Sequence, residues 1–566
     1  MKSFSRFLIQ YSPVRLPVKV GDCLFASQQR CRLRFSVKRF RASLAIVMAI
    51  YALGSGLSLA QDELDDYWMK SYEMREKMVQ DKFRPRYHFL PPEGRWNDIN
   101  GAVFYKGRYH IGYLQKISNG RGIRDFSSWQ HISSRDLLHW RYHKASLREP
   151  FDGLYGDYFN SGDVMEGTDV PTIITNMPRH GIVVYQSFDD NLDEWVPLPQ
   201  NPVIPVAPGE LGKQKRSAVY PECMIFDPSG WKEGDTYYAL IGSKNYRPGY
   251  EGDSTSLFKS KDLANWEYVG PFYKSERKWT EEIEDCACSN FFPFGDKHML
   301  LMHTHRPYSK AQYYIGRYEN ERFYPEINGQ LSRSGTMLSG PETLIDDRGR
   351  RIFWGWLSDA RHRGDARGWE SIMTLPWHFS PAEDNTLLID PVEELQTLRY
   401  KERRHADLSI AKGNVVVVDG FSGNCMEIKL RLESEDATRF GLKLFCSPNL
   451  EEETVITYDR AEQQFVIDFE KASEKEIKYY VGGGGVLEKG NLKQRVPFSL
   501  EGPAALDLDI FVDKSVIEIF VNSRICLVQR VYPTREDSTQ FRLFSEDGNI
   551  RASQLFKWEM DATNPW

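Results

Sequence analysis

The last third of the chain alternates apolar and polar residues with a period of two. Residues 505–523, ALDLDIFVDKSVIEIFVNS, follow this pattern and break it only at Asp513 and Lys514. A period of two is typical of a strand with one buried face, so we predict a hairpin that turns at this break. NVVVVDG, CMEIKLRLES and GLKLFCSP have the same character, VGGGGVLEKG reads as a loop, and no long helical period follows residue 400. The pattern therefore predicts an antiparallel β-sandwich.

Earlier in the chain, one sequence motif occurs in three variants. Each contains a polar turn, an acid, a leucine and a tryptophan, and each follows a β-branched or aromatic stretch: SSRDLLHWRYH at 133–143, SFDDNLDEWVPL at 187–198 and KSKDLANWEYVGP at 259–271. Degenerate repeats of short strands at such spacings predict a β-propeller with insertions in its loops. We interpret the repeated tryptophans as residues that pack the blades.

The length of 566 residues exceeds what one hydrophobic core usually serves, so two folded domains are expected. The sequence pattern changes from these repeats to the period of two near PVEELQTLR, residues 391–399. We place the propeller at 86–390 and the sandwich at 391–566, with an N-terminal extension at 61–85 and a leader at 1–60.

The leader has the composition of an export signal. Ten Lys or Arg residues and one acid occur in the first 42 residues, and they precede the apolar run 44–53 and a small-residue end near Ala60. This order of basic, apolar and small segments predicts a secretory signal peptide, and hence a periplasmic, cell-surface or secreted protein. The basic part is long, so a start downstream of Met1 or an uncleaved anchor is the alternative.

Composition excludes some partners. The net charge is −6 and the basic excess is confined to the leader, so we expect no nucleic-acid partner. Six cysteines lie outside the leader with no zinc-type spacing, and we expect mostly buried thiols and no metal or other cofactor.

Aromatic residues make up 13% of the chain, which suits strands and sugar-binding surfaces. An exported, aromatic-rich, all-β chain favours carbohydrate chemistry, and glycoside hydrolysis needs two carboxyl groups with opposed roles. Three places offer acids near a strand or turn: Asp98 in a tight turn of WNDING, Asp227 where an apolar strand ends in Asp-Pro, and the acidic run 281–285. Each also has an ordinary interpretation as a turn or surface charge.

Taken together, these phrases make the chain resemble glycoside hydrolase family 32, the β-fructosidases, from about residue 86 to the C-terminus. The family's W-M-N-D-P-N-G, W-G-H-A-x-S-x-D-L-x-H-W, S-G-S and R-D-P motifs correspond to WNDING, WQHISSRDLLHW, NSGD and FDP. Further similar phrases follow in the family's order: GRRIFWGWLSD, GWESIMTLPW, PVEELQTLR, DIFVDKSVIEIFVN and QRVYP.

The resemblance implies a five-bladed propeller followed by a sandwich, and a retaining mechanism. It makes Asp98 the nucleophile and Asp227 the stabiliser of the transition state. Asn97, Gln115, Trp129 and Ser161 become candidate substrate-binding residues, with blade core as the alternative for Trp129. The sequence departs from the family at Ile99, where proline is usual, and at Phe226, where arginine is usual.

The largest departure concerns the acid/base. The family's E-C-P-D corresponds to ACSN, so Ala287 occupies the glutamate position. We expect a relocated carboxyl, either Asp285, which would share a strand face with Ala287, or Glu284, if a bulge re-aims the chain. Glu222 is a weaker candidate.

These inferences predict an exported glycoside hydrolase that releases terminal β-D-fructofuranosyl units from sucrose or fructans. The alternatives are a fructosyltransferase or other furanosidase on the same fold, and a sugar-binding propeller without catalysis that lost its acid at Ala287. We expect no membrane association beyond the N-terminal signal or anchor, and the sequence leaves the oligomeric state open.

Overall fold

The computed structural model describes residue 76 and residues 78–91, 95–117, 126–147, 159–208, 216–220, 223–242, 255–273, 276–281, 284–305, 309–333, 338–361, 369–434, 436–481, 485–487, 490–500 and 505–564. The predicted leader and most of the predicted extension lie outside these residues. Within the described part of the chain, no helix has both the length and the apolar character that a membrane crossing requires.

The described residues between Arg95 and Pro391 form five antiparallel sheets in chain order. The first contains β1 (Arg95–Tyr105), β2 (Arg108–Ile117), β3 (Phe126–Ser134) and β4 (Arg141–Tyr142). The second contains β5 (Gly162–Val164), β6 (Thr172–Met177), β7 (Gly181–Gln186), β8 (Val196–Pro197) and β9 (Ile204–Pro205). The third contains β10 (Pro228–Glu233), β11 (Thr236–Ile241), β12 (Thr255–Ser260) and β13 (Trp266–Tyr273). The fourth contains β14 (Ala287–Phe294), β15 (Lys297–Thr304), β16 (Lys310–Glu319) and β17 (Arg322–Gln330). The fifth contains β18 (Leu338–Ile345), β19 (Arg351–Ser358), β20 (Ser371–Met373), β21 (Trp377–Pro381) and β22 (Leu387–Pro391).

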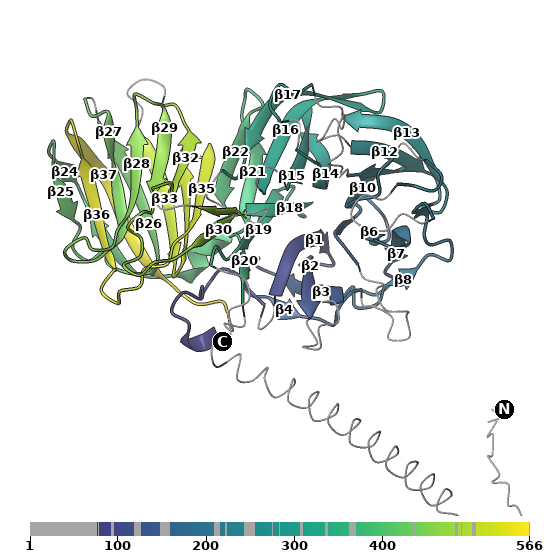
Figure 1. Ribbon diagram of the computed structural model, residues 1–566, viewed down its shortest axis with the longest axis horizontal. Helices are drawn as coiled ribbons and strands as arrows, with labels where there is room; N and C mark the ends of the chain where they lie inside the picture. The colour runs from purple at the N-terminus through teal and green to yellow at the C-terminus, as the bar shows by residue number, and fades with distance from the viewer. Residues whose placement is uncertain are drawn as a thin grey trace, which may run out of the picture. The chain divides into compact units, whose positions relative to one another are not determined.

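The first strands of these sheets surround a common axis. β1 contacts β5, β5 contacts β10, β10 contacts β14, β14 contacts β18, and β18 contacts β1 (Figure 1). This closed arrangement is the predicted β-propeller. Side chains near the start of each first strand therefore converge, although they are far apart in the sequence.

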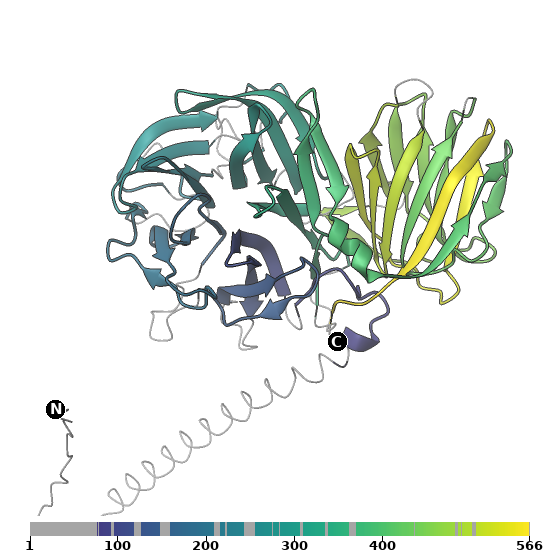
Figure 2. The same cartoon turned by 180° about the vertical axis from the view of Figure 1, so that it is seen from behind.

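The remaining strands form the predicted sandwich. A short 3-10 helix (Glu393–Leu398), the green coil in Figure 2, leads into it. One sheet contains β23 (Arg399–His405), β24 (Leu408–Ile410), β26 (Cys425–Glu433), β33 (Leu506–Asp513), β34 (Val516–Val521), β35 (Ile525–Arg530) and β37 (Ile550–Met560). The other contains β25 (Val415–Val417), β27 (Arg439–Cys446), β28 (Thr454–Asp459), β29 (Gln464–Asp468), β32 (Lys493–Pro497) and β36 (Gln540–Ser545), while β30 (Tyr479–Val481) and β31 (Gly485–Leu487) pair separately.

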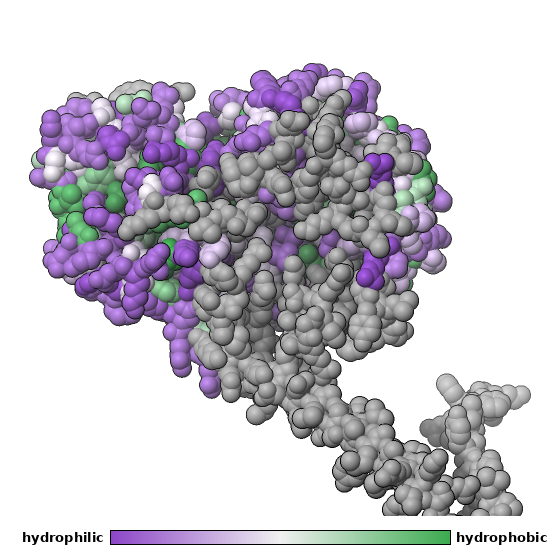
Figure 3. Space-filling view, viewed as in Figure 1, coloured by the Kyte–Doolittle hydropathy of each residue, from purple (hydrophilic) through white to green (hydrophobic). Residues whose placement is uncertain are grey.

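The alternating pattern explains the core of the sandwich. Ile428 and Leu430 of β26, Ile510 of β33 and Leu543 of β36 belong to one buried cluster. The predicted hairpin is confirmed, since Asp513 pairs with Val516 across its turn. The predicted loop at 481–490 instead carries β31, which pairs with β30. In the view of Figure 3 the described surface is mostly hydrophilic, with hydrophobic side chains gathered at one side of the sandwich.

Buried polar contacts join the sandwich to the propeller. Glu518 of β34 accepts hydrogen bonds from the Trp377 indole at 2.7 Å and from the Leu375 backbone N–H at 3.1 Å. It also lies 3.3 Å from Nε2 of His88, whose Nδ1 lies 2.9 Å from Asp513. Because these groups are fully buried, the contacts fix the chain that precedes β1 against both domains.

Candidate active site

Asp98 lies in an irregular part of β1. The stretch predicted as a tight turn is instead a strand whose pairing with β2 shifts between Asn97 and Ile99, and again between Asn100 and Val103. Asp98 is the extra residue of the first shift and has a φ of 47°. A bulge re-aims one side chain without ending the strand, which explains why an acid can sit there within a continuous ladder.

Two neighbours hold the Asp98 carboxylate. Asn97 Nδ2 and Ser161 Oγ each donate a hydrogen bond of 2.9 Å to its Oδ2. Asn100 braces the backbone, because its Nδ2 donates to the Asp98 carbonyl at 3.0 Å and its Oδ1 accepts from the N–H of Gly162 at 3.2 Å. Donors aimed at a carboxylate hold it in one orientation, which is what a nucleophilic carboxylate requires.

Gly340 of β18 closes the other side of Asp98. Its φ is +51°, and a Cβ at this position would lie 3.1 Å from Asp98 Oδ1. Glycine is therefore required here both for backbone conformation and for space. No motif in the sequence indicated this contact.

Asp227 lies immediately before the third innermost strand. We expected a strand to end at Asp-Pro, but β10 begins at Pro228. Proline is compatible with the first position of a strand, because the N–H it lacks is not needed there. Asp227 is 4% exposed and directly precedes β10, whereas Asp98 is the fourth residue of β1.

Cys288 joins the two aspartates. Its thiol lies 3.7 Å from Asp227 Oδ2, and it occupies a second bulge with a φ of 45°. Burial raises the pKa of Cys288 well above its usual value, and the charges of Asp227 and Asp98 raise it further. Asp98, Ser161, Cys288 and Asp227 thus form one cluster, in which our sequence reasoning missed Cys288.

The two acids expected to replace the glutamate lie in different networks. Glu284 accepts from Lys310 Nζ at 2.7 Å and from Gln312 Nε2 at 3.1 Å. Asp285 accepts from Thr304 Oγ1 at 2.9 Å and from the His305 backbone N–H at 2.7 Å. Both carboxyls are buried, and both precede β14 instead of sharing a strand with Ala287.

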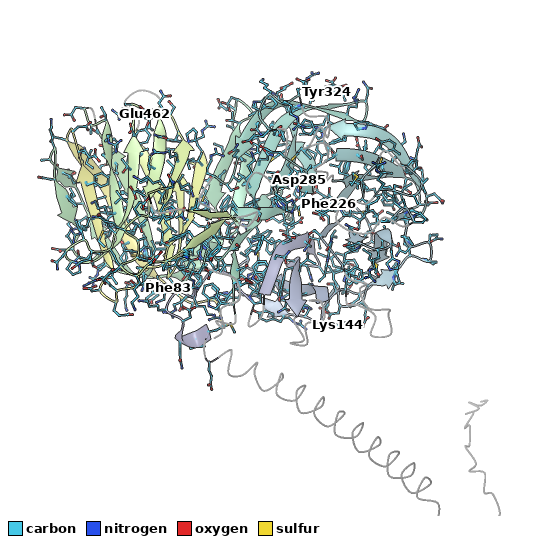
Figure 4. All side chains as sticks on the ribbon, in the orientation of Figure 1. Phe83, Lys144, Phe226, Asp285, Tyr324 and Glu462 are labelled. Carbon is cyan, nitrogen blue, oxygen red and sulfur yellow. The ribbon has the colours of Figure 1, made fainter. Side chains whose placement is uncertain are left out.

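Asp285 also holds an imidazole. Its Oδ2 lies 2.9 Å from Nδ1 of His305, and the His305 ring is centred 5.9 Å from that of Phe226. Phe226 directly precedes Asp227, so this network reaches the neighbourhood of Asp227. Figure 4 labels Asp285 and Phe226 close together near the middle of the propeller. No sequence spacing pointed to His305.

The remaining predicted residues differ in their surroundings. Gln115 pairs with Trp96 across β1 and β2 and is partly exposed, so it stays a candidate for substrate binding. Trp129 is 1% exposed and donates its indole N–H to the Asn160 carbonyl at 2.9 Å, which favours the alternative that it supports the blade core. Glu222 lies outside the described residues.

A cavity of about 170 Å³ lies farther along the axis, lined by residues of β1, β5, β10, β14 and β18. Asp163 of β5 lines it and interacts with Glu342 of β18. Burial raises the pKa of Asp163 to about 8, and burial together with the charge of Asp163 raises that of Glu342. Asp163 is two residues beyond Ser161, and Glu342 two beyond Gly340, so this pair lies next to the Asp98 cluster along the same strands.

Two family models match the chain. The Glycosyl hydrolases family 32 N-terminal domain matches residues 88–391, and the Glycosyl hydrolases family 32 C terminal matches residues 394–559. The chain belongs to glycosyl hydrolases family 32. It is therefore a glycoside hydrolase, and the resemblance stated from its motifs is confirmed.

Relatives of this family 32 chain match most of its length. It is 27% identical over 555 residues to "Beta-fructofuranosidase, insoluble isoenzyme 4" of Oryza sativa subsp. japonica, covering 85% of this chain and 89% of that protein. It is 23% identical over 509 residues to "Sucrose-6-phosphate hydrolase" of Zymomonas mobilis, covering 86% of this chain and 94% of that protein. The solved structure of fructan 1-exohydrolase IIa from Cichorium intybus has 18% identity and a TM-score of 0.70, covering 85% and 98% of the two chains, and so shares the fold.

Proposed function

We propose that this protein is a retaining β-fructofuranosidase that removes terminal fructosyl units from sucrose or a fructan. The observation that carries the proposal is the cluster of Asp98 and Asp227 at the starts of two innermost strands, within a family 32 chain. Relatives named β-fructofuranosidase and fructan 1-exohydrolase support the choice of a fructoside.

In this mechanism Asp98 attacks the anomeric carbon while the glycosidic C–O bond breaks. The leaving sugar's oxygen takes a proton from the acid, and a covalent fructosyl intermediate remains on Asp98. Ser161 and Asn97 hold the attacking carboxylate in one orientation, which lowers the entropic cost of reaching the transition state. The carboxylate of Asp227 stabilises the positive charge that develops on the sugar ring. Water then releases fructose in the second step.

We infer that Asp285 serves the acid/base step through His305. The Glu284 carboxyl is already bound by the Lys310 ammonium and by the Gln312 amide. Asp285 instead orients a partly exposed imidazole beside the residue that precedes Asp227, and an imidazole held by a buried carboxylate is well suited to proton transfer. His305 would be the proton donor and Asp285 its positioning residue.

Product analysis tests the reaction. Purified protein is incubated with sucrose, inulin and levan, and free fructose and fructosyl oligomers are measured. Fructose release at low and high sucrose supports the hydrolase, whereas oligomers as the main product identify a transferase. Binding to a fructan without any product supports the non-catalytic alternative suggested by Ala287 and contradicts the proposal.

Leaving-group dependence tests the proton donor. His305→Gln and Asp285→Asn should each lower kcat/KM on sucrose about 10²- to 10⁴-fold, with a much smaller loss on p-nitrophenyl β-D-fructofuranoside, whose leaving group needs little protonation. Glu281→Gln, an exposed acid of the same segment, is the matched control. If Glu284→Gln alone shows this difference between substrates, Glu284 is the acid and the inference about His305 is wrong.

We also propose that the protein acts outside the cytoplasm, on the basis of the basic and apolar N-terminal segment. Fractionation of cells that produce the full chain, with N-terminal sequencing of the mature protein, tests this. Cleavage near Ala60 supports export through a signal peptide. An intact N-terminus in the cytoplasmic fraction contradicts it.

A further inference from the structure

A cluster of imidazoles lies in the first sheet. His131 lies on β3, and His143 follows β4 and donates its backbone N–H to the His131 carbonyl at 3.0 Å. This backbone contact places the two rings side by side, with centroids 4.2 Å apart and planes 25° apart. Both rings face a residue of the next sheet, Asp193, which lies between β7 and β8.

Three potential ligand atoms converge at this place. Nδ1 of His143 lies 2.8 Å from Asp193 Oδ1, and Nδ1 of His131 lies 3.9 Å from the same oxygen. All three ligand atoms fall within 4.8 Å of one another. In a tetrahedral zinc site, neighbouring ligand atoms are about 3.4 Å apart, so the observed separations lie on either side of that value.

His131 supplies the second, independent observation. Its side chain is 3% exposed, and its Nδ1 is buried with no hydrogen-bond partner within the described structure. A buried ring nitrogen without a partner is costly, because it has lost its bond to water and gained nothing. A cation between His131 and Asp193 would remove that cost.

The opposite ring nitrogens are already bound, as they are in metal sites. Nε2 of His131 lies 2.9 Å from Nδ1 of His110, and Nε2 of His143 lies 2.7 Å from the Ser133 hydroxyl. Such outer contacts fix the ring orientation and leave the inner nitrogen to face a metal.

We propose that His131, His143 and Asp193 form a binding site for a divalent transition metal, with Zn²⁺ as the best fit. Two imidazoles and one carboxylate suit zinc, whereas Mg²⁺ and Ca²⁺ prefer oxygen ligands. The side chain of Asp193 is 28% exposed, which provides an entry path and a position for water as the fourth ligand. The bound ion would join the first sheet to the second and would act on stability rather than on the hydrolytic step.

The charge balance limits the affinity. Asp193 supplies one negative charge, while the guanidinium groups of Arg108 and Arg141 are close enough to lower the pKa of His143. These cations oppose a second positive charge. We therefore expect binding weaker than that of a structural zinc site with thiolate ligands.

The experiment uses the full chain, stripped of metal with a chelator and titrated with ZnCl₂, MgCl₂ or CaCl₂. Calorimetry should show one Zn²⁺ per chain and no comparable binding of Mg²⁺ or Ca²⁺. The melting temperature should rise with Zn²⁺ concentration, because a ligand that binds only the folded state stabilises it. With Co²⁺ as the probe, visible absorption bands of a four-coordinate ion should appear.

Asp193→Asn is the first variant, because its partly exposed side chain can change without opening the core, and His143→Gln is the second. Each should weaken Zn²⁺ binding at least about tenfold and abolish the rise in melting temperature. Asp190→Asn in the same loop and His139→Asn in the same hairpin are exposed controls that should bind as the unaltered chain does. Absence of stoichiometric Zn²⁺ binding, or Asp193→Asn binding with unaltered affinity, overturns the proposal.

Discussion

Asp163 offers the sharpest test of the electrostatics along the propeller axis. Burial raises its pKa from 3.8 to about 8 in the folded protein, beside the second buried carboxyl of Glu342. The folded state therefore keeps a proton that the unfolded chain releases above pH 4. The stability that this proton provides is fully present below pH 4 and is lost as the pH rises toward 8.

The size of the effect follows from linkage. In the window between the two pKa values, each pH unit costs about 1.4 kcal/mol per group, so the step from pH 5 to pH 7 costs about 3 kcal/mol. Asp163→Asn carries no titrating proton and keeps nearly the same shape. The stability of this variant relative to the unaltered protein should thus improve by about 3 kcal/mol between pH 5 and pH 7. For a domain of about 300 residues, with an unfolding entropy of about 2.1 cal/mol/K per residue, that is roughly 5 °C in melting temperature.

Calorimetry at pH 5, 6 and 7, with constant ionic strength, measures the difference between the two melting temperatures. Asp235→Asn, an exposed acid in the turn between β10 and β11, is the control and should follow the unaltered protein at each pH. Glu342→Gln shows whether the proton is shared, since it should flatten the pH dependence in the same way. If the melting temperatures of Asp163→Asn and the unaltered protein stay parallel from pH 5 to pH 7, Asp163 is not held protonated and the reasoning fails.

Further expectations concern the site and the domain junction. Asp98→Asn should lower kcat on the order of 10⁴-fold with an unchanged melting temperature, and residual activity within tenfold of normal would exclude the nucleophile role. Gly340→Ala should impair turnover by crowding the Asp98 carboxylate, which a comparison of kcat with the melting temperature would reveal. Cys288 should react slowly with iodoacetamide at pH 7 and faster in Asp227→Asn, because removal of the nearby charge lowers the thiol pKa. Mass spectrometry of the labelled peptide measures the two rates. Burial lowers the pKa of His88, but hydrogen bonds to two carboxylates outweigh this effect and raise the pKa to about 8. The stability that the His88 proton provides is therefore complete below pH 6.5 and lost above pH 8. In His88→Gln, melting temperatures measured across this pH range should no longer show that decrease.

The local pattern of apolar and polar residues was sufficient to predict the sandwich and the fold class of the first domain. A strand period of two, interrupted at Asp513 and Lys514, depends only on neighbouring residues, and the structure pairs Asp513 with Val516 as expected. The conformation of 95–101 was not predictable in the same way. Asn, Asp and Gly favour turns when read locally, but the sheet partner β2 keeps this segment extended and confines the irregularity to bulges.

The candidate site shows the same limit. Asp98 and Asp227 could be found because each stands at the start of a strand with recognisable neighbours in the sequence. Cys288 and Gly340 could not, since their importance arises only where the innermost strands meet. Nothing in the spacing of 288 or 340 distinguishes them from ordinary core positions.

The acid/base question depends on contacts rather than on position in the motif. Glu284 and Asp285 lie three and two residues before Ala287, and the sequence alone does not choose between them. The structure separates them by their partners: Glu284 is paired with the buried ammonium of Lys310, whereas Asp285 is paired with the partly exposed ring of His305. The proposed mechanism uses the second arrangement, because only there does the carboxyl hold a group that can both give and take a proton. Lys310→Met tests this distinction, because it removes the cation beside Glu284 and leaves Asp285 and His305 in place; sucrose hydrolysis should still depend on His305.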